Sequence, residues 1–130
     1  MPLHLPTTVF FACLLAIWIL VLTWRVITRR RSGGVVMGDD GDRALAKAIR
    51  AQANATEQVP IFLILFGLAE ATGAWPWLLW LIGAVFLAGR LAHGAYFGWH
   101  GLHWKLRFYG MAATLCAQGA IIVTLAATNL

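Results

Sequence analysis

Four long apolar runs dominate this chain of 130 residues. They cover about residues 7–27, 43–72, 77–97 and 109–127, and each approaches or exceeds the roughly 20 residues that an α-helix needs to cross a bilayer. Hydrophobic residues make up 61% of the chain, more apolar surface than a soluble protein of this size can bury. The sequence therefore predicts one all-α membrane domain over residues 1–130, a bundle of four transmembrane helices.

The basic residues lie beside the apolar runs. The first connection carries Arg25, Arg29 to Arg31 and Arg43, and the third carries Lys105 and Arg107, whereas the second connection and both tails carry none. Because positive loops stay on the cytoplasmic side, we expect these two connections in the cytoplasm and both termini outside it. This distribution accounts for the net charge of +5 without a nucleic-acid partner.

Four polar residues interrupt the second run. Arg43, Arg50, Asn54 and Glu57 lie on one narrow face of a helix that turns by about 100° per residue. A charge at membrane depth costs about 2.5–3.5 kcal/mol, so these groups must face protein, water or a ligand. One interpretation is a hydrogen-bond and salt-bridge network between helices. The other is a site for an anionic small ligand, because basic groups outnumber acidic groups near this depth.

The third run carries a second polar face. Arg90, His93 and Phe97 are spaced at i, i+3 and i+7, with Tyr96 to one side. A single histidine in such a place is more often a hydrogen-bonded packing residue than a catalyst. Lys105 and Arg107, which follow in the third connection, can be a topology signal that contacts lipid phosphates.

Small residues are expected to let the helices approach closely. Gly94 and Gly98 form a GxxxG pair in the third run. Cys13 and Cys116 both lie inside apolar runs, so we expect small buried hydrophobes and no disulfide, and no Cys/His spacing resembles a metal site. A row of alanines recurs at every fourth position of the third run: Ala84, Ala88 and Ala92.

At residues 50–60 the chain reads RAQANATEQVP, which resembles the signature Arg-Ala-x-x-Asn-x-x-Glu-x-x-Pro of the MAPEG family. These are membrane-associated proteins in eicosanoid and glutathione metabolism. The length, the four spans and the arginine in the third span fit as well, and the Gly-Asp-rich entry to the second span resembles the small bacterial members. The resemblance implies a homotrimer in a bacterial inner membrane, with glutathione held between adjacent subunits near the cytoplasmic face.

The resemblance also implies site residues. A catalytic arginine at the start of the fourth span is matched by Arg107, with Lys105 as the alternative. Family tyrosines fall near His93 and Phe97, with Tyr96 as an offset substitute. The full set implied to bind the cofactor is Arg50, Gln52, Asn54, Glu57, Arg90, His93 and Tyr96.

These residue types suit glutathione, which carries two carboxylates, an amine and a thiol. Arginine forks bind carboxylates bidentately, and Glu57 can take the amine. A cation such as Arg107 or Lys105 lowers the pKa of a nearby thiol and so favours the reactive thiolate. The resemblance therefore implies a glutathione-dependent membrane transferase or peroxidase that conjugates glutathione to a lipophilic electrophile or reduces a lipid hydroperoxide.

Two other functions fit parts of the same sequence. The first is a non-catalytic, lipid-binding scaffold protein on the same fold, since fold does not fix function. The second is a small multidrug transporter, which is also a four-span protein with a membrane glutamate. Such a transporter needs an acidic residue without nearby cations, and here Glu57 has Arg50 and Arg90 as possible partners.

Overall fold

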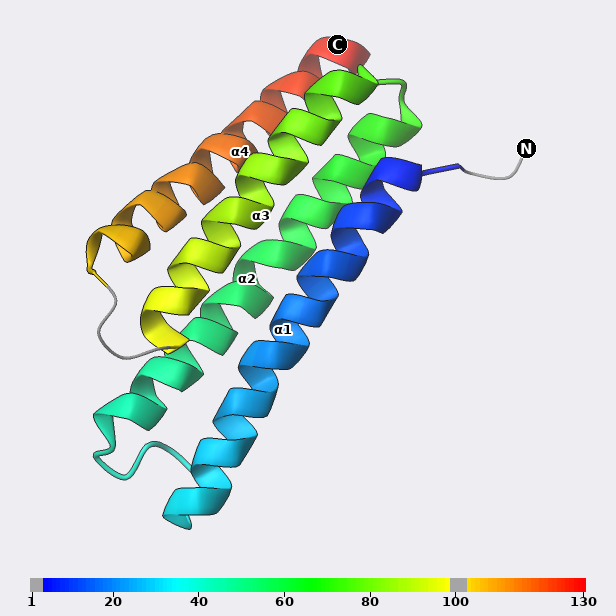
Figure 1. The fold of residues 1–130 in the computed structure, drawn as a ribbon. Coiled ribbons are helices and arrows are strands. Elements are labelled where there is room, and N and C mark those ends of the chain that lie inside the picture. Colours follow the sequence, from blue (N-terminus) through cyan, green and yellow to red (C-terminus); the bar gives the residue numbers. More distant parts are fainter. Residues whose placement is uncertain (1–3, 99–102) are drawn as a thin grey trace.

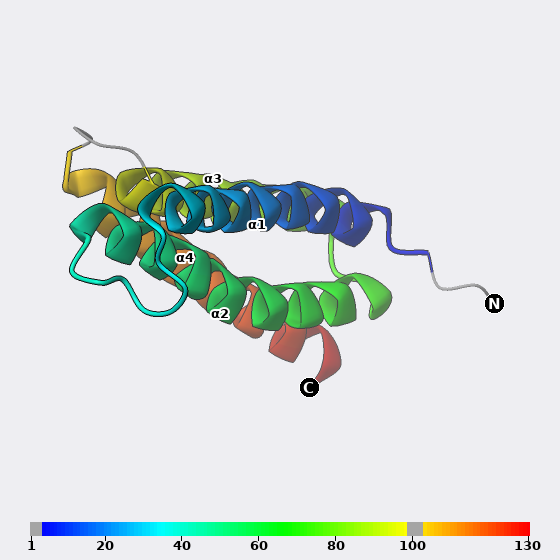
Figure 2. The same ribbon diagram turned by 90° about the horizontal axis from the view of Figure 1, so that it is seen from below.

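The structure is a computed structural model that describes residues 4–98 and 103–130. Figure 1 shows four α-helices that run up and down beside one another, as the sequence predicts. Figure 2 shows α1 and α3 in one layer and α2 and α4 in the other. Within the described residues every helix pair is in contact except α1 and α4. The helices are α1 (Pro6–Gly33), α2 (Arg43–Ala71), α3 (Pro76–Gly98) and α4 (Lys105–Asn129).

Three of the described helices are long and apolar enough to cross a membrane, namely α1, α3 and α4. Only 17% of the most apolar stretch of α1 and 22% of that of α4 is buried, so most of their apolar side chains face outward. Outward-facing apolar residues suit a helix whose solvent is lipid. The fourth predicted span, α2, does not meet the same criterion, because polar residues such as Asn54 and Glu57 lie within it.

Two helix ends differ from the sequence prediction. Arg29 to Arg31, predicted in a connection, lie in the last turns of α1, which ends at Gly34 in a left-handed conformation with φ of 67°. Lys105 and Arg107, also predicted in a connection, lie in the first turn of α4. Hydropathy marks the part of a helix that lies in lipid, whereas lysine and arginine are good helix formers that extend the helix beyond it.

Carboxylates cap the first turns of α1 and α2, at opposite ends of this helix pair. Asp42 caps α2, where its side chain accepts a hydrogen bond of 2.8 Å from the backbone N–H of Ala44. At the other end, Glu70 of α2 accepts hydrogen bonds of 2.9 and 2.7 Å from the backbone N–H groups of Thr7 and Thr8. Glu70 therefore caps the first turn of α1 from a neighbouring helix, which the sequence does not reveal.

Glycines set the distance between the helices. The ring of Phe11 in α1 lies against Gly83 of α3, and the ring of Trp18 lies against Gly94. Gly89 and Gly110 bring α3 and α4 together: a Cβ on Gly110 would lie 2.6 Å from the backbone nitrogen of His93. Gly94 thus contributes to close packing as predicted.

Two expectations about buried small residues are wrong. Ala84 and Ala88 of the alanine row are exposed on the outer face of α3. Cys13 and Cys116 are free and exposed as well. The reason is the same in both cases: an apolar residue on a membrane helix can face lipid, so hydrophobicity does not tell which side of the helix is buried.

All ten lysines and arginines lie in the helix halves next to one end of the bundle, where α1 and α3 end and α2 and α4 begin. The described N- and C-terminal ends lie at the opposite end (Figure 1). The positive-inside rule predicts that the end with these residues faces the cytoplasm. We call it the basic end.

The close approach of α3 and α4 predicts that Gly110→Ala lowers the free energy of unfolding by about 1–3 kcal/mol, because the added methyl meets backbone atoms that cannot yield. Thermal unfolding in detergent measures the change. Gly119→Ala on the same helix is the control, since a Cβ there meets nothing within 4 Å and should leave stability equal or slightly higher. Equal melting temperatures for the two variants would contradict this packing.

Candidate functional site

Arg90 is the largest of the fully buried side chains, with 2% of its surface exposed. Its guanidinium donates hydrogen bonds from Nε to Thr114 Oγ1 (2.9 Å), from Nη1 to Asn54 Oδ1 (2.7 Å) and from Nη2 to Met111 Sδ (3.6 Å). All three acceptors belong to neutral side chains. The charge therefore stays buried through hydrogen bonding alone, which fixes the direction of each donor.

The same residue reaches the remaining helix through its backbone. The indole Nε1 of Trp18 in α1 donates to the backbone oxygen of Arg90 at 3.2 Å. Asn54 belongs to α2, and Thr114 and Met111 belong to α4. Arg90 thus connects all four helices at one level of the bundle, on the side of the basic end.

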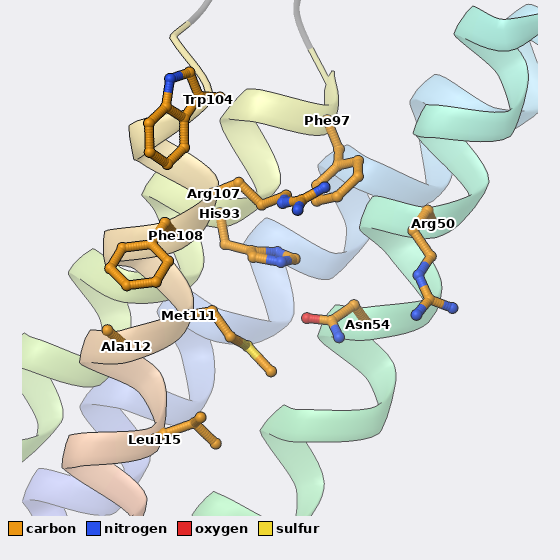
Figure 3. A pocket seen from close by; sticks show the side chains of 10 residues that line it. All are labelled: Arg50, Asn54, His93, Phe97, Trp104, Arg107, Phe108, Met111, Ala112 and Leu115. Carbon is orange, nitrogen blue, oxygen red and sulfur yellow. The ribbon is translucent and has the colours of Figure 1, made fainter.

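A cavity of about 590 Å³ opens beside this junction, between α2 on one side and α3 and α4 on the other (Figure 3). This volume is within the usual range for small-molecule sites of about 300–1,000 Å³. Its polar wall consists of Arg50, Asn54, His93 and Arg107. Its other wall is mostly apolar and consists of Phe97, Trp104, Phe108, Met111, Ala112 and Leu115.

Aromatic contacts position the polar wall. His93 is buried and its ring centroid lies 5.0 Å from that of Phe97. The Arg107 guanidinium lies over the same Phe97 ring, with Cζ 6.0 Å from the ring centroid. In Figure 3, Arg107, His93 and Phe97 point into the cavity from α3 and α4, and Arg50 and Asn54 face them from α2. Two arginines, one from α2 and one from α4, give this polar wall the charge that suits an anion.

The structure brings together only part of the residue set that the sequence suggests. Arg50, Asn54, His93 and Arg107 line the cavity, and Arg90 lies directly behind it through its bond to Asn54. The other four residues of the set lie elsewhere: Gln52, Glu57, Tyr96 and Lys105.

Each of these four has a different setting. Gln52 is half-buried on α2, and Glu57 is exposed. Tyr96 carries the Lys47 ammonium over its ring, with Nζ 5.5 Å from the centroid. Lys105 lies on the opposite side of α4, in a groove lined by α3. Arg107 and Lys105, which the sequence offers as alternatives, therefore serve different surfaces.

The expectation that Glu57 has Arg90 as a partner is wrong. The buried guanidinium is directed to Asn54, Thr114 and Met111, and within the described residues no ion pair joins Glu57 to Arg50 or Arg90. Arg50 and Glu57 are both exposed, whereas Asn54 between them is buried. Of these three residues of the α2 signature, only Asn54 points into the bundle, and Arg50 and Glu57 lie at its edge.

A model of the MAPEG family matches residues 8–127, nearly the whole chain. The chain belongs to the MAPEG family. Among its relatives is the inner membrane protein YecN of Escherichia coli K12, 38% identical over 107 residues that cover 82% of this chain and 80% of the relative. The YecN protein of Escherichia coli O6:H1 CFT073 matches to the same extent. This MAPEG protein is therefore a membrane protein, similar to proteins of the inner membrane.

Several residues of the site in this MAPEG protein have no counterpart in the sequence prediction. Thr114 and Met111 hold Arg90, and Trp18 binds its backbone oxygen. The apolar wall on α4 follows a spacing of four, three and four residues, which could have been recognised in the sequence as one helix face. It comprises Trp104, Phe108, Met111 and Leu115.

Thr114→Val removes the acceptor of Arg90 Nε in this MAPEG protein and leaves a buried charged donor unpaired. We expect the free energy of unfolding to fall by about 1–3 kcal/mol, measured as a lower melting temperature in detergent. The matched control is Thr124→Val on the same helix, because each hydroxyl donates at 2.8 Å to the carbonyl four residues before it, but only Thr114 also accepts from Arg90. A control that loses as much as Thr114→Val would show that the buried bond contributes nothing.

Proposed function

We propose that this MAPEG protein is a glutathione-dependent membrane transferase or peroxidase, and that the cavity between α2, α3 and α4 is its site. The observation that carries the proposal is the pairing of a cationic wall with an apolar wall in one cavity. A hydrophilic anion fits the first wall, and a lipophilic co-substrate fits the second. Family membership supports the same assignment, because the family includes glutathione transferases and peroxidases.

The cationic wall suits glutathione in particular. Arg50 lines the cavity from α2 and Arg107 lines it from α4, so each can bind one carboxylate of the tripeptide. Asn54 presents its amide beside Arg50 while its oxygen is held by Arg90. His93 adds an imidazole edge next to Arg107. Asn54 and His93 are held by buried contacts before a ligand arrives, which lowers the entropy lost on binding.

Bound glutathione would supply the thiol, whose sulfur forms a carbon–sulfur bond with an electrophile as the leaving group departs and the thiol proton goes to solvent. With a hydroperoxide, two glutathione molecules would be oxidised to the disulfide while the hydroperoxide is reduced to an alcohol and water. The chain contributes positive charge near that thiol. Arg107 is the better candidate for this role than Lys105, because its side chain lines the cavity and that of Lys105 lies on the opposite side of α4. A guanidinium there favours the thiolate and the negative charge that develops in the reaction.

The lipophilic co-substrate would enter along α4. Phe108 and Leu115 are exposed at the same time as they line the cavity, so the apolar wall is continuous with the outer surface of the bundle. An apolar molecule dissolved in the bilayer can therefore reach the cationic wall without crossing water. The site would then bind one water-soluble and one lipid-soluble reactant next to each other.

We further propose a homotrimer, as the family resemblance implies. The face of α2 that carries Arg50 and Glu57 continues as an exposed stripe through Ile61, Ile64 and Leu68. The carboxylate of Glu57 lies near the middle of a 29-residue helix, where exposure to lipid is costly. A second and third copy of the chain would cover this face and bring Gln52 and Glu57 to the edge of a neighbouring cavity.

Glutathione binding is the primary test. The melting temperature of the purified protein should rise as glutathione is added. At a glutathione concentration 100 times the dissociation constant, the free energy of unfolding should increase by about 2.7 kcal/mol. Arg50→Gln should weaken this response tenfold or more by loss of a charged bidentate contact, which is about 1.4 kcal/mol. Arg43→Gln, one exposed arginine earlier on α2, is the control. An equal shift of the melting temperature with glutathione in Arg50→Gln and Arg43→Gln would refute the site. The trimer is tested separately: native mass spectrometry of the same sample should show three chains per particle.

Turnover separates the two basic residues of α4. With 1-chloro-2,4-dinitrobenzene or cumene hydroperoxide as substrate, Arg107→Gln should lower kcat by about 10²-fold or more, since it removes a charge that acts on the transition state. Lys105→Gln should lower kcat by a smaller factor because its ammonium lies on the other side of α4. The reverse order would assign the thiolate to Lys105. Binding of glutathione with no turnover of any electrophile or hydroperoxide would instead indicate the non-catalytic scaffold.

A further inference from the structure

A second hollow lies on the outer side of the α3–α4 pair, away from the cavity of the proposed function. It is a groove of about 250 Å³ between the two helices. Its floor consists of small residues of the two helices, among them Ala88, Ala92, Gly110 and Ala113. Lys105 and Tyr109 line it at the basic end.

The groove combines one positive charge with an apolar channel. Lys105 is exposed at the first turn of α4, and within the described residues no acidic side chain pairs with its ammonium. Tyr109 is exposed beside it, with an aromatic ring and a hydroxyl of the kind found at membrane interfaces. Beyond these two residues the lining carries no charge.

The length of the groove matches one half of a bilayer. Lys105 and Ala113 are eight residues apart in α4, which is about 12 Å along the helix axis. The hydrocarbon core of one leaflet is about 15 Å deep. A molecule that places an anion at Lys105 can therefore lay an alkyl chain along the floor and remain within that leaflet.

We propose that this groove binds one anionic phospholipid of the leaflet at the basic end, with its phosphate at Lys105 and one acyl chain over Ala88 and Ala92. The charge complements the anionic phosphate, and the narrow, small-residue floor accommodates a chain that larger side chains would exclude. The lipid would cover Ala88 and Ala92 and would pair with Lys105, which does not line the cavity of the proposed function.

A lipid phosphate would neutralise the Lys105 ammonium directly, whereas a helix packed in the groove would do so only if it placed a carboxylate against Lys105. The proposal concerns a surface separate from the glutathione cavity, so it does not depend on the proposed function.

Delipidated protein in detergent should be titrated with dioleoylphosphatidylglycerol, dioleoylphosphatidylcholine or glycerol 1-phosphate, with bound molecules counted by native mass spectrometry. We expect the parent protein to retain phosphatidylglycerol in preference to phosphatidylcholine. Lys105→Gln should weaken phosphatidylglycerol about fivefold, the fold change that corresponds to about 1 kcal/mol per basic residue at a membrane surface. Ala92→Leu, which fills the groove, should weaken both lipids.

Two variants serve as matched controls. Arg31→Gln removes one exposed charge at the same end of the bundle, and Ala84→Leu adds the same bulk to the exposed face of α3 outside the groove. Both should bind phosphatidylglycerol like the parent, and melting curves should show that all variants are folded. Equal lipid retention in all variants, or glycerol 1-phosphate that competes as well as the whole lipid, would overturn the proposal. A change in the number of chains per particle in Ala92→Leu would also overturn it, since a second copy of the chain would then be the occupant.

Discussion

The buried guanidinium of Arg90 is the interaction on which the other features of the bundle depend. It has three neutral acceptors on two helices, and its backbone oxygen accepts from a third. A charged group in this position is tolerated when each of its nitrogens is directed to an acceptor, so it dictates which faces of the helices must meet. The glycine contact between Gly89 and Gly110 brings Thr114 close enough to be one of those acceptors.

This junction also divides the surface of α4 into two environments. On one side Arg107 and the apolar wall border the cavity against α2, and on the other side Lys105 and Tyr109 border a shallow groove against α3. Two basic residues only two positions apart in the sequence thereby line different hollows. A helix rotates by about 200° over two residues, which is the physical reason for the division.

The polar face of α2 has a similar double character. Asn54 turns inward and holds Arg90, whereas Arg50 and Glu57 stay at or beyond the edge of the single chain. A polar helix face that one chain does not cover is unfavourable in lipid and therefore demands a neighbour. The MAPEG signature thus combines one residue of the internal framework, Asn54, with two residues, Arg50 and Glu57, that a single chain leaves exposed.

The sequence by itself determined the class of fold, the number and order of the helices and the family, because hydropathy over 20 residues and an eleven-residue signature are local properties. It also placed Arg50, Asn54 and Arg90 among the important residues. Only the tertiary structure decided that Arg90 binds Asn54, Thr114 and Met111 and not Glu57. It also decided that Glu70 caps α1, and that Arg107 and Lys105 line different hollows on opposite sides of α4. These facts depend on the rotation and spacing of one helix against another, and in an apolar membrane helix no periodic alternation of polar residues records which side faces protein and which faces lipid.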